Sequence, residues 1–136
     1  MSGLSGVGGK TISVWVEEIT AWGKRKGWDK PLLARKKGTH RSNGPKGVNH
    51  DAVLAKLALV HSELSEAVEE AREDRWTEWH SSSKPDKPEG FVIELADAVI
   101  RLFHIAGLLG LDLEAAVRDK TAYNETRPHR HGGKKA

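Results

Sequence analysis

The chain has 136 residues and a mass of 15.0 kDa, which favours one domain, and it contains no cysteine, which excludes disulfides, thiolate metal ligands and a cysteine nucleophile. Its formal net charge of +3 conceals an asymmetry, because nine Lys and Arg lie between residues 24 and 46, whereas eleven of the nineteen acids lie between residues 63 and 97. An acidic centre repels a phosphate backbone, so this pattern argues against nucleic acid as the partner and favours cation-assisted handling of a small polyphosphate.

The sequence predicts four helices in chain order and no strand. Residues 1–10 are rich in glycine and lack the apolar run of a signal peptide, so we expect a flexible arm in a cytoplasmic protein. Apolar residues at helical spacing predict a first helix near 11–23, and a long basic loop rich in Gly, Pro and Asn follows over 24–49. A second amphipathic helix is expected over about 51–75, before a loop with two prolines and a glycine.

The third predicted helix, at about 91–109, is apolar on nearly all sides, so it should be the most buried element. Four ionisable residues within it argue against a membrane span: Glu94, Asp97, Arg101 and His104. Asp112 can cap a fourth helix, which must end before Pro128. The predicted fold class is all-α and resembles a four-helix bundle, with a helical domain over 11–127 and a basic tail over 128–136.

Two pairs of carboxylates carry the strongest chemical signal in the sequence. Glu63 and Glu66 are three positions apart on the second helix, as are Glu94 and Asp97 on the third, so each pair occupies one helix face. Taken alone, the first pair fits a solvated face and the second fits an internal ion pair, for instance with Arg101. Taken together, four acids converging from facing helices would form the all-oxygen cage that hard cations such as Mg²⁺ prefer.

A basic row follows on the fourth helix. Lys120, Asn124 and Arg127 are spaced four and three positions apart and share a helix face, and Lys134 lies beyond them after two glycines. Such residues can simply complement the dipole at a helix C-terminus. Beside a metal cage, the same residues are suited to donate hydrogen bonds to phosphate oxygens.

Five tryptophans offer aromatic surfaces for a ligand or for the core. Trp15 and Trp22, on the first helix, fit core positions better than base-stacking positions, and Trp28 lies in the basic loop. Trp76 and Trp79 follow the acidic helix and are better candidates for stacking on a nucleobase. The alternative for both is a helix end packed on the bundle. Trp76 is the residue we expect to contact the base.

In this order the motifs resemble those of the MazG-like nucleotide pyrophosphohydrolases, members of the all-α NTP pyrophosphatase superfamily. The resemblance rests on E-x-x-E, on E-x-x-D about thirty residues later, on K-x-x-x-N-x-x-R and on a basic tail, and it covers about residues 54–134. It departs from the family pattern at Ser62, where many members carry an acid next to the first motif.

The resemblance implies Mg²⁺-dependent hydrolysis of a nucleoside triphosphate to the monophosphate and pyrophosphate, with Mn²⁺ as an alternative cofactor and a house-cleaning role in nucleotide metabolism. It implies a homodimer or a homotetramer. It assigns the metal ligands to Glu63, Glu66, Glu94 and Asp97, and phosphate contacts to Lys120, Asn124 and Arg127. We further expect Glu66 to orient the attacking water and Lys134 to close over the phosphates. Two alternatives stay open: a phosphoribosyl-ATP pyrophosphohydrolase of the same superfamily, and a non-enzymatic helical module that binds nucleotides or nucleic acid.

Overall fold

The computed structural model describes residues 9–29 and 47–128. Most of the predicted N-terminal arm, basic loop and C-terminal tail, including Lys134, lies outside these residues. The described chain has four helices and no strand: α2 (Ile12–Arg25), α3 (His50–Arg72), α4 (Phe91–Leu108) and α5 (Leu113–Glu125). The predicted all-α class is confirmed, and every helix begins and ends within about three residues of its predicted bounds.

N-capping side chains fix the starts of three helices. Thr11, Asn49 and Asp112 each accept a hydrogen bond from the backbone N–H three positions on, at 3.2, 3.1 and 3.0 Å. These bonds satisfy donors that a helix N-terminus leaves without partners. α4 has no side-chain cap, and its first two N–H groups donate instead to the carbonyls of Arg75 and Trp76 at 2.8 and 3.1 Å. The chain after α3 is thereby tied to the start of α4.

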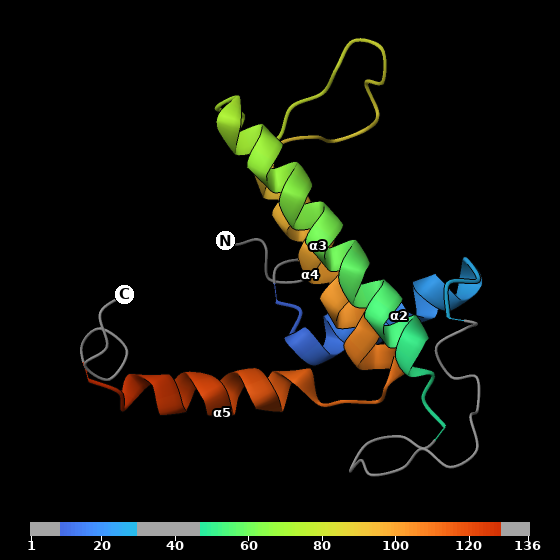
Figure 1. Ribbon diagram of the computed structural model, residues 1–136, viewed down its shortest axis with the longest axis vertical. Helices are drawn as coiled ribbons and strands as arrows, with labels where there is room; N and C mark the ends of the chain where they lie inside the picture. The colour runs from blue at the N-terminus through green and yellow to red at the C-terminus, as the bar shows by residue number, and fades with distance from the viewer. Residues whose placement is uncertain (1–8, 30–46, 129–136) are drawn as a thin grey trace.

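The helices are arranged around one long pair (Figure 1). α3 and α4 run antiparallel, and α2 packs across the end of this pair where α4 finishes. α5 leaves α4 at a steep angle, has no buried residue, and makes its main contacts with α2. Bundle-like packing is therefore present in α2, α3 and α4 and does not extend to α5. None of the described helices is both long and apolar enough to cross a lipid bilayer.

Two glycines let α2 and α4 approach closely. A Cβ atom at Gly23 would lie 2.5 Å from Nε2 of His104. A Cβ atom at Gly107 would collide with Oγ1 of Thr20, whose hydroxyl donates to the carbonyl of Val16 at 2.6 Å. Because a packed interior has little room for an extra methyl group, these glycines set the separation of the two helices.

Gly107→Ala is expected to destabilise the protein, because overpacking costs about 1–3 kcal/mol and the better helix propensity of alanine returns only about 1 kcal/mol. Adding Thr20→Ala removes the colliding hydroxyl and should restore most of the lost stability. Urea denaturation of the parent, both single variants and the double variant measures these effects. Gly9→Ala is the control, since nothing lies within 4 Å of a Cβ atom there. Parental stability in Gly107→Ala would contradict the close approach of α2 and α4.

Candidate metal centre and adjoining cavity

Antiparallel packing of α3 on α4 brings Glu63 beside Glu94 and Asp97. One carboxylate oxygen from each residue lies within 4.8 Å of the other two, and we call these three residues the acid cluster. Cations of the Mg²⁺ and Ca²⁺ type bind oxygen ligands at about 2.0–2.6 Å, so an ion seated between these oxygens can reach all three. The structure thus brings together three of the four acids that the sequence singled out.

Glu66 lies next to the acid cluster but is not one of its members. It follows Glu63 by about one helical turn, and its side chain is exposed. Its charge is close enough to help raise the pKa of Glu94. Glu66 has no ion-pair partner among the described residues. Its part in holding a metal or a water molecule stays a prediction.

Crowding of the carboxylates disfavours the fully ionised form of the acid cluster. Loss of hydration, followed by repulsion from Glu66, Asp97 and Glu63, raises the pKa of Glu94 to about 7, and a hydrogen bond with Glu63 favours the protonated form further. Burial and then the charge of Glu63 also raise the pKa of Asp97, whereas Arg101 acts to lower it. In the absence of a cation, the cluster therefore holds a proton close to neutral pH.

Arg101 is the cation that the chain itself places at the acid cluster. Its Nε donates to Oε1 of Glu63 at 2.7 Å, and 39% of the Arg101 side chain is exposed against 14% of the Glu63 side chain. The sequence offered Arg101 as an ion-pair partner for Glu94 and Asp97 on its own helix. The structure instead pairs it across the two helices with Glu63.

A cavity of about 190 Å³ opens beside the acid cluster. The rings of Trp22 and Trp28 form an aromatic corner in its wall, edge to face with their centroids 4.7 Å apart. His104 closes another side: it is 7% exposed, its Nε2 has no hydrogen-bond partner among the described residues, and burial lowers its pKa. The aromatic rings of this corner offer surface on which a planar ring can pack. The cavity is lined by Ile19, Trp22, Trp28, Glu63, Asp97, Ile100, Arg101 and His104.

The turn after α2 places Trp28 in this wall. Gly27 has a positive φ of 76°, a conformation that glycine adopts without strain, and it folds the chain back at the end of the helix. The N–H of Trp28 then donates to the carbonyl of Gly23 at 2.9 Å. From α3, Nζ of Lys56 donates to the carbonyl of Trp28 at 2.9 Å. The aromatic corner is therefore fixed to both α2 and α3.

A larger hollow of about 480 Å³ lies between α2 and the corner where α4 meets α5, and no member of the acid cluster lines it. Two of the acids along its edge already have partners. Asp112 caps α5, and Oε1 of Glu114 accepts a hydrogen bond from the backbone N–H of Ser13 at 2.9 Å. We therefore interpret this hollow as a seam between helices rather than a second acid site.

The structure does not bring the basic row to the acid cluster within one chain. Lys120 and Asn124 lie exposed on α5, where Nζ of Lys120 is 4.8 Å from the ring centroid of Tyr123, and Arg127 follows the end of the helix. A rise of 1.5 Å per residue puts Asp97 about 16 Å from the end of α4 and Lys120 about 10 Å along α5. Because α5 turns away from the α3–α4 pair instead of running back along it, Lys120 stays far from Asp97 within one chain.

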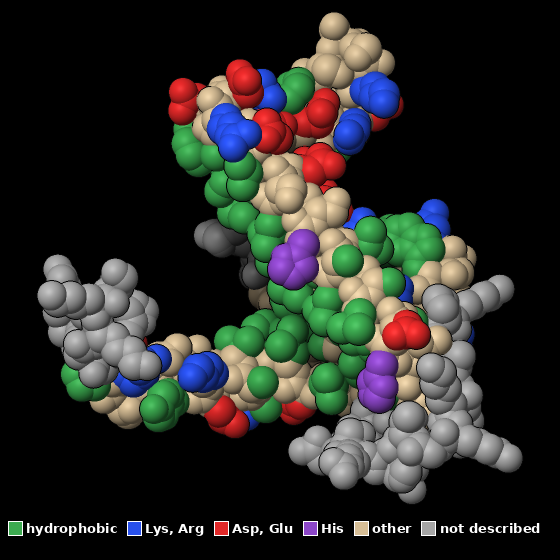
Figure 2. Space-filling model, viewed as in Figure 1, with side chains coloured by type: hydrophobic (Ala, Val, Ile, Leu, Met, Phe, Trp, Pro, Cys, Tyr) green, Lys and Arg blue, Asp and Glu red, His purple; other side chains and the backbone are tan. Residues whose placement is uncertain are grey.

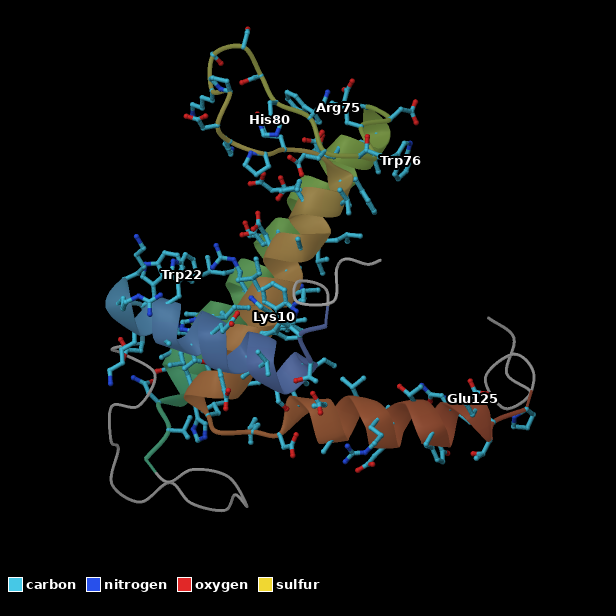
Figure 3. All side chains as sticks on the ribbon, turned by 180° about the vertical axis from the view of Figure 1, so that it is seen from behind. Lys10, Trp22, Arg75, Trp76, His80 and Glu125 are labelled. Atoms are coloured by element: carbon cyan, nitrogen blue, oxygen red, sulfur yellow. The ribbon has the colours of Figure 1, made fainter. Side chains whose placement is uncertain are left out.

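Trp76 does not line the cavity either. It is half exposed just after α3 and packs edge to face against Phe91, with ring centroids 5.0 Å apart. Figure 3 shows Trp76 at the far end of the α3–α4 pair, whereas Trp22 lies on α2. The role of Trp76 at a nucleobase stays a prediction. The aromatic surface beside the acids comes instead from Trp22, which the pattern assigned to the core, and from Trp28.

Two further site residues carried a signal in the sequence. Arg101 and His104 follow Asp97 by four and seven positions, so helical spacing puts all three on one face of α4. Trp28 carried no such signal, because its place depends on the turn after α2 rather than on a periodic pattern.

The donor set fits a hard divalent cation. The acid cluster offers only carboxylate oxygens, the described residues add no histidine to it, and the chain has no cysteine. Oxygen ligands suit Mg²⁺ and Mn²⁺ better than softer metals. Comparisons with models of protein families, with curated proteins and with solved structures find no match for this chain. Its function must therefore be inferred from the chemistry of the site.

Cation affinity is expected to rise with pH up to about pH 7 and then to level off. The pKa of Glu94, about 7, exceeds its ordinary value of 4.5, so below pH 7 the folded site holds a proton that must leave before a cation binds. Displacing one proton gives a rise of up to about tenfold per pH unit. Calorimetric titration with Mn²⁺ between about pH 5.5 and pH 8 measures it. Glu94→Gln should flatten the profile, and a flat profile in the parent would contradict the shared proton.

Proposed function

We propose that the chain is a Mg²⁺-dependent nucleoside triphosphate pyrophosphohydrolase, which converts an NTP or dNTP and water to the monophosphate and pyrophosphate. The observation that best supports this proposal is the acid cluster beside a cavity with an aromatic corner. A triphosphate needs a cation and a nucleobase needs a flat apolar wall, and here the two lie side by side. The order of the motifs in the sequence supports the same activity, and a house-cleaning role in nucleotide metabolism goes with it.

All four acids would act as metal ligands, and Glu66 would also act on water. Glu63, Glu94 and Asp97 would hold the cation, with Glu66 completing the set from the next turn of α3. When bound, Mg²⁺ would offset the charge of the triphosphate and polarise the attacked phosphorus. Because Glu66 is exposed and lacks an ion-pair partner among the described residues, its carboxylate can accept a hydrogen bond from water. In this proposal Glu66 orients the water that attacks the α-phosphorus.

The base would enter the cavity against the aromatic corner. The edge-to-face contact of Trp22 with Trp28 leaves ring surface in the cavity wall, and stacking on an aromatic side chain does not depend on which base is bound. His104 also lines the cavity, but its Nε2 is buried against Gly23, so the ring contributes contact surface rather than a hydrogen bond to the base. Trp76 would contact the base only from another copy of the chain.

Asp97→Asn is expected to lower turnover by at least about 100-fold, because it deletes an anionic metal ligand. The assay is a panel of NTPs and dNTPs with Mg²⁺ that resolves monophosphate and pyrophosphate, with phosphoribosyl-ATP included to separate the two enzyme readings. In chelator the melting temperature should be unchanged or higher. The pKa of Asp97 is raised in the fold, so its ionised form opposes folding at neutral pH and the amide removes that effect.

Asp119→Asn is the matched control, since Asp119 lies exposed on α5 beside Arg118 and outside the acid cluster. It should leave turnover at the parental level. Turnover of Asp97→Asn near that of the parent would remove Asp97 from the metal site. Release of neither product from any nucleotide in the panel would remove the proposed activity altogether.

The working unit in this proposal is a homodimer or a homotetramer. Both helices of the long pair keep an apolar stripe exposed at helical spacing, and Figure 2 shows hydrophobic side chains along one edge of the pair and onto the start of α5. Contiguous exposed apolar surface on a folded chain marks a contact surface. The stripes comprise Leu57, Leu64 and Val68 on α3, and Val92, Leu95, Val99 and Leu102 on α4.

A second copy could also supply the basic row. At 100° per residue, Glu66 lies about 160–180° around α3 from Leu57 and Leu64, and Glu63 lies about 100–120° from them, so both acids face away from the apolar stripe. The thirteen residues of α5 span about 20 Å, which matches the width of two packed helices of about 10 Å each. An α5 that projects past the shared apolar face is thus long enough to cross the partner's α3–α4 pair and bring Lys120 toward the partner's acids.

Mixing two inactive variants tests this arrangement. Lys120→Ala/Asn124→Ala lacks two of the three residues of the basic row, and Asp97→Asn lacks a metal ligand. If each site combines two chains, a mixed dimer has one site with both defects and one intact site, so a random equal mixture should recover about one quarter of parental activity. Activity is measured after subunits have exchanged, with each variant alone as the control. A mixture as inactive as its components would mean that each site is built from one chain.

A further inference from the structure

Arg101 contacts both parts of the site. Its Nε donates to Glu63 in the acid cluster at 2.7 Å, and its side chain lines the cavity beside Asp97 and His104. A guanidinium carries five N–H donors, and the bond to Glu63 uses one of them. Arg101 has no other hydrogen-bond partner among the described residues, and 39% of its side chain is exposed. The remaining donors are therefore available to a ligand in the cavity.

Arg101 and a bound cation compete for the same carboxylate. Glu63 offers one of the oxygens that a cation at the acid cluster would use, and it is also the ion-pair partner of Arg101. Two positive groups on one carboxylate repel each other, so a divalent cation weakens the pair. The positive charge of Arg101 then needs a new partner. The phosphate chain of a nucleotide, joined to a base in the cavity, would bring negative charge to that point.

We propose that Arg101 is a substrate-binding residue that pairs with Glu63 in the metal-free protein and with the phosphate chain once metal and nucleotide are bound. This inference rests on the proposed function, since it assigns a ligand contact within the same site. The planar guanidinium suits the task because two of its N–H groups can meet two phosphate oxygens at once. Because Arg101 belongs to α4, it would also give each chain a phosphate contact of its own, independent of α5.

A purely structural role for Arg101 predicts different measurements. If the residue only ties α3 to α4, Arg101→Gln should lower stability and should weaken metal and phosphate binding together. If our inference is correct, the two affinities move in opposite directions. Arg101→Gln removes the competitor for Glu63, so Mn²⁺ alone should bind about threefold to tenfold more tightly. The same variant should bind inorganic triphosphate with Mg²⁺ at least about tenfold more weakly.

Arg101→Lys separates charge from geometry. Lysine keeps the positive charge beside Glu63, so Mn²⁺ affinity should stay near the parental value. It loses the planar fork, so affinity for inorganic triphosphate should still fall. This variant also keeps an ion pair between the two helices, which leaves the inference testable if Arg101→Gln folds poorly. Arg118→Gln on α5 is the matched control, because Arg118 is exposed and, within the part of the chain that the structure describes, its one ion pair is with neighbouring Asp119 at 3.6 Å.

Both affinities are measured by calorimetry on the full-length chain, without turnover. Opposite shifts in Arg101→Gln, with weakened triphosphate binding in Arg101→Lys, would support the inference. Unchanged triphosphate affinity in both variants, or weaker Mn²⁺ binding in Arg101→Gln, would overturn it. The proposed function fails separately: opposite shifts without product from any nucleotide would keep the Arg101 contact and remove the pyrophosphohydrolase activity.

Discussion

Negative charge crowded between α3 and α4 is the constraint on which the rest of the site depends. Three carboxylates have oxygens within 4.8 Å of one another, and burial weakens the hydration that would otherwise screen them. Only three things can relieve this arrangement: a proton, a positive side chain or a bound cation. The chain supplies the first through the raised pKa of Glu94 and the second through Arg101. Both are reversible, which leaves room for the third.

Neighbouring elements strengthen this constraint. α2 packs across the end of the α3–α4 pair, and its Trp22 and the following Trp28 cover the side of the site where Asp97 and Arg101 lie. That cover forms the cavity wall, and it also removes water from the charged groups. Desolvation is the largest cause of the raised pKa of both Glu94 and Asp97. The packing that creates the cavity therefore also raises the cost of ionising the acids, which is the cost that a proton, Arg101 or a cation would offset.

Acids at similar spacing on α3 have different surroundings, which sequence spacing does not reveal. Glu70 continues the row of Glu63 and Glu66 and is only 7% exposed, yet its carboxylate pairs with Arg75 five residues later. The backbone N–H of Arg75 also donates to the carbonyl of Glu70 at 2.9 Å. Glu70 thus closes the end of α3, whereas Glu63 has its partner 38 residues away on another helix. Glu70, with its partner five residues away, thus has a local structural role, whereas Glu63 has a partner far away in sequence and lies in the candidate site.

Local chemistry explains which parts of the fold could be predicted. Caps such as Asn49 and Asp112 mark helix starts, and acids three positions apart on two helices identify a shared face, because both signals act within one turn. The direction of α5 and the meeting of Trp22 with Trp28 depend on turns and on contacts between helices. Neither feature produces a periodic pattern in the sequence. Arg101 is intermediate: helical spacing predicted the face of α4 on which it lies, but not its ion pair with Glu63 on α3.

The charge of a triphosphate distinguishes an enzyme site from a simple nucleotide-binding module. Two like charges 4 Å apart repel by about 1 kcal/mol in water and by about 4 kcal/mol near a protein surface. A module that recognised a nucleotide through its base alone would leave the phosphates in solvent, and it would gain nothing from acids held beside the base cavity. Here Glu63 and Asp97 line the cavity itself. In the proposed complex, a triphosphate attached to a base in that cavity would meet carboxylates that it could approach only through cations. Nucleotide binding at this site would therefore require a metal, and the repulsion retained in the metal-free fold is the physical reason that we expect a metal to bind there.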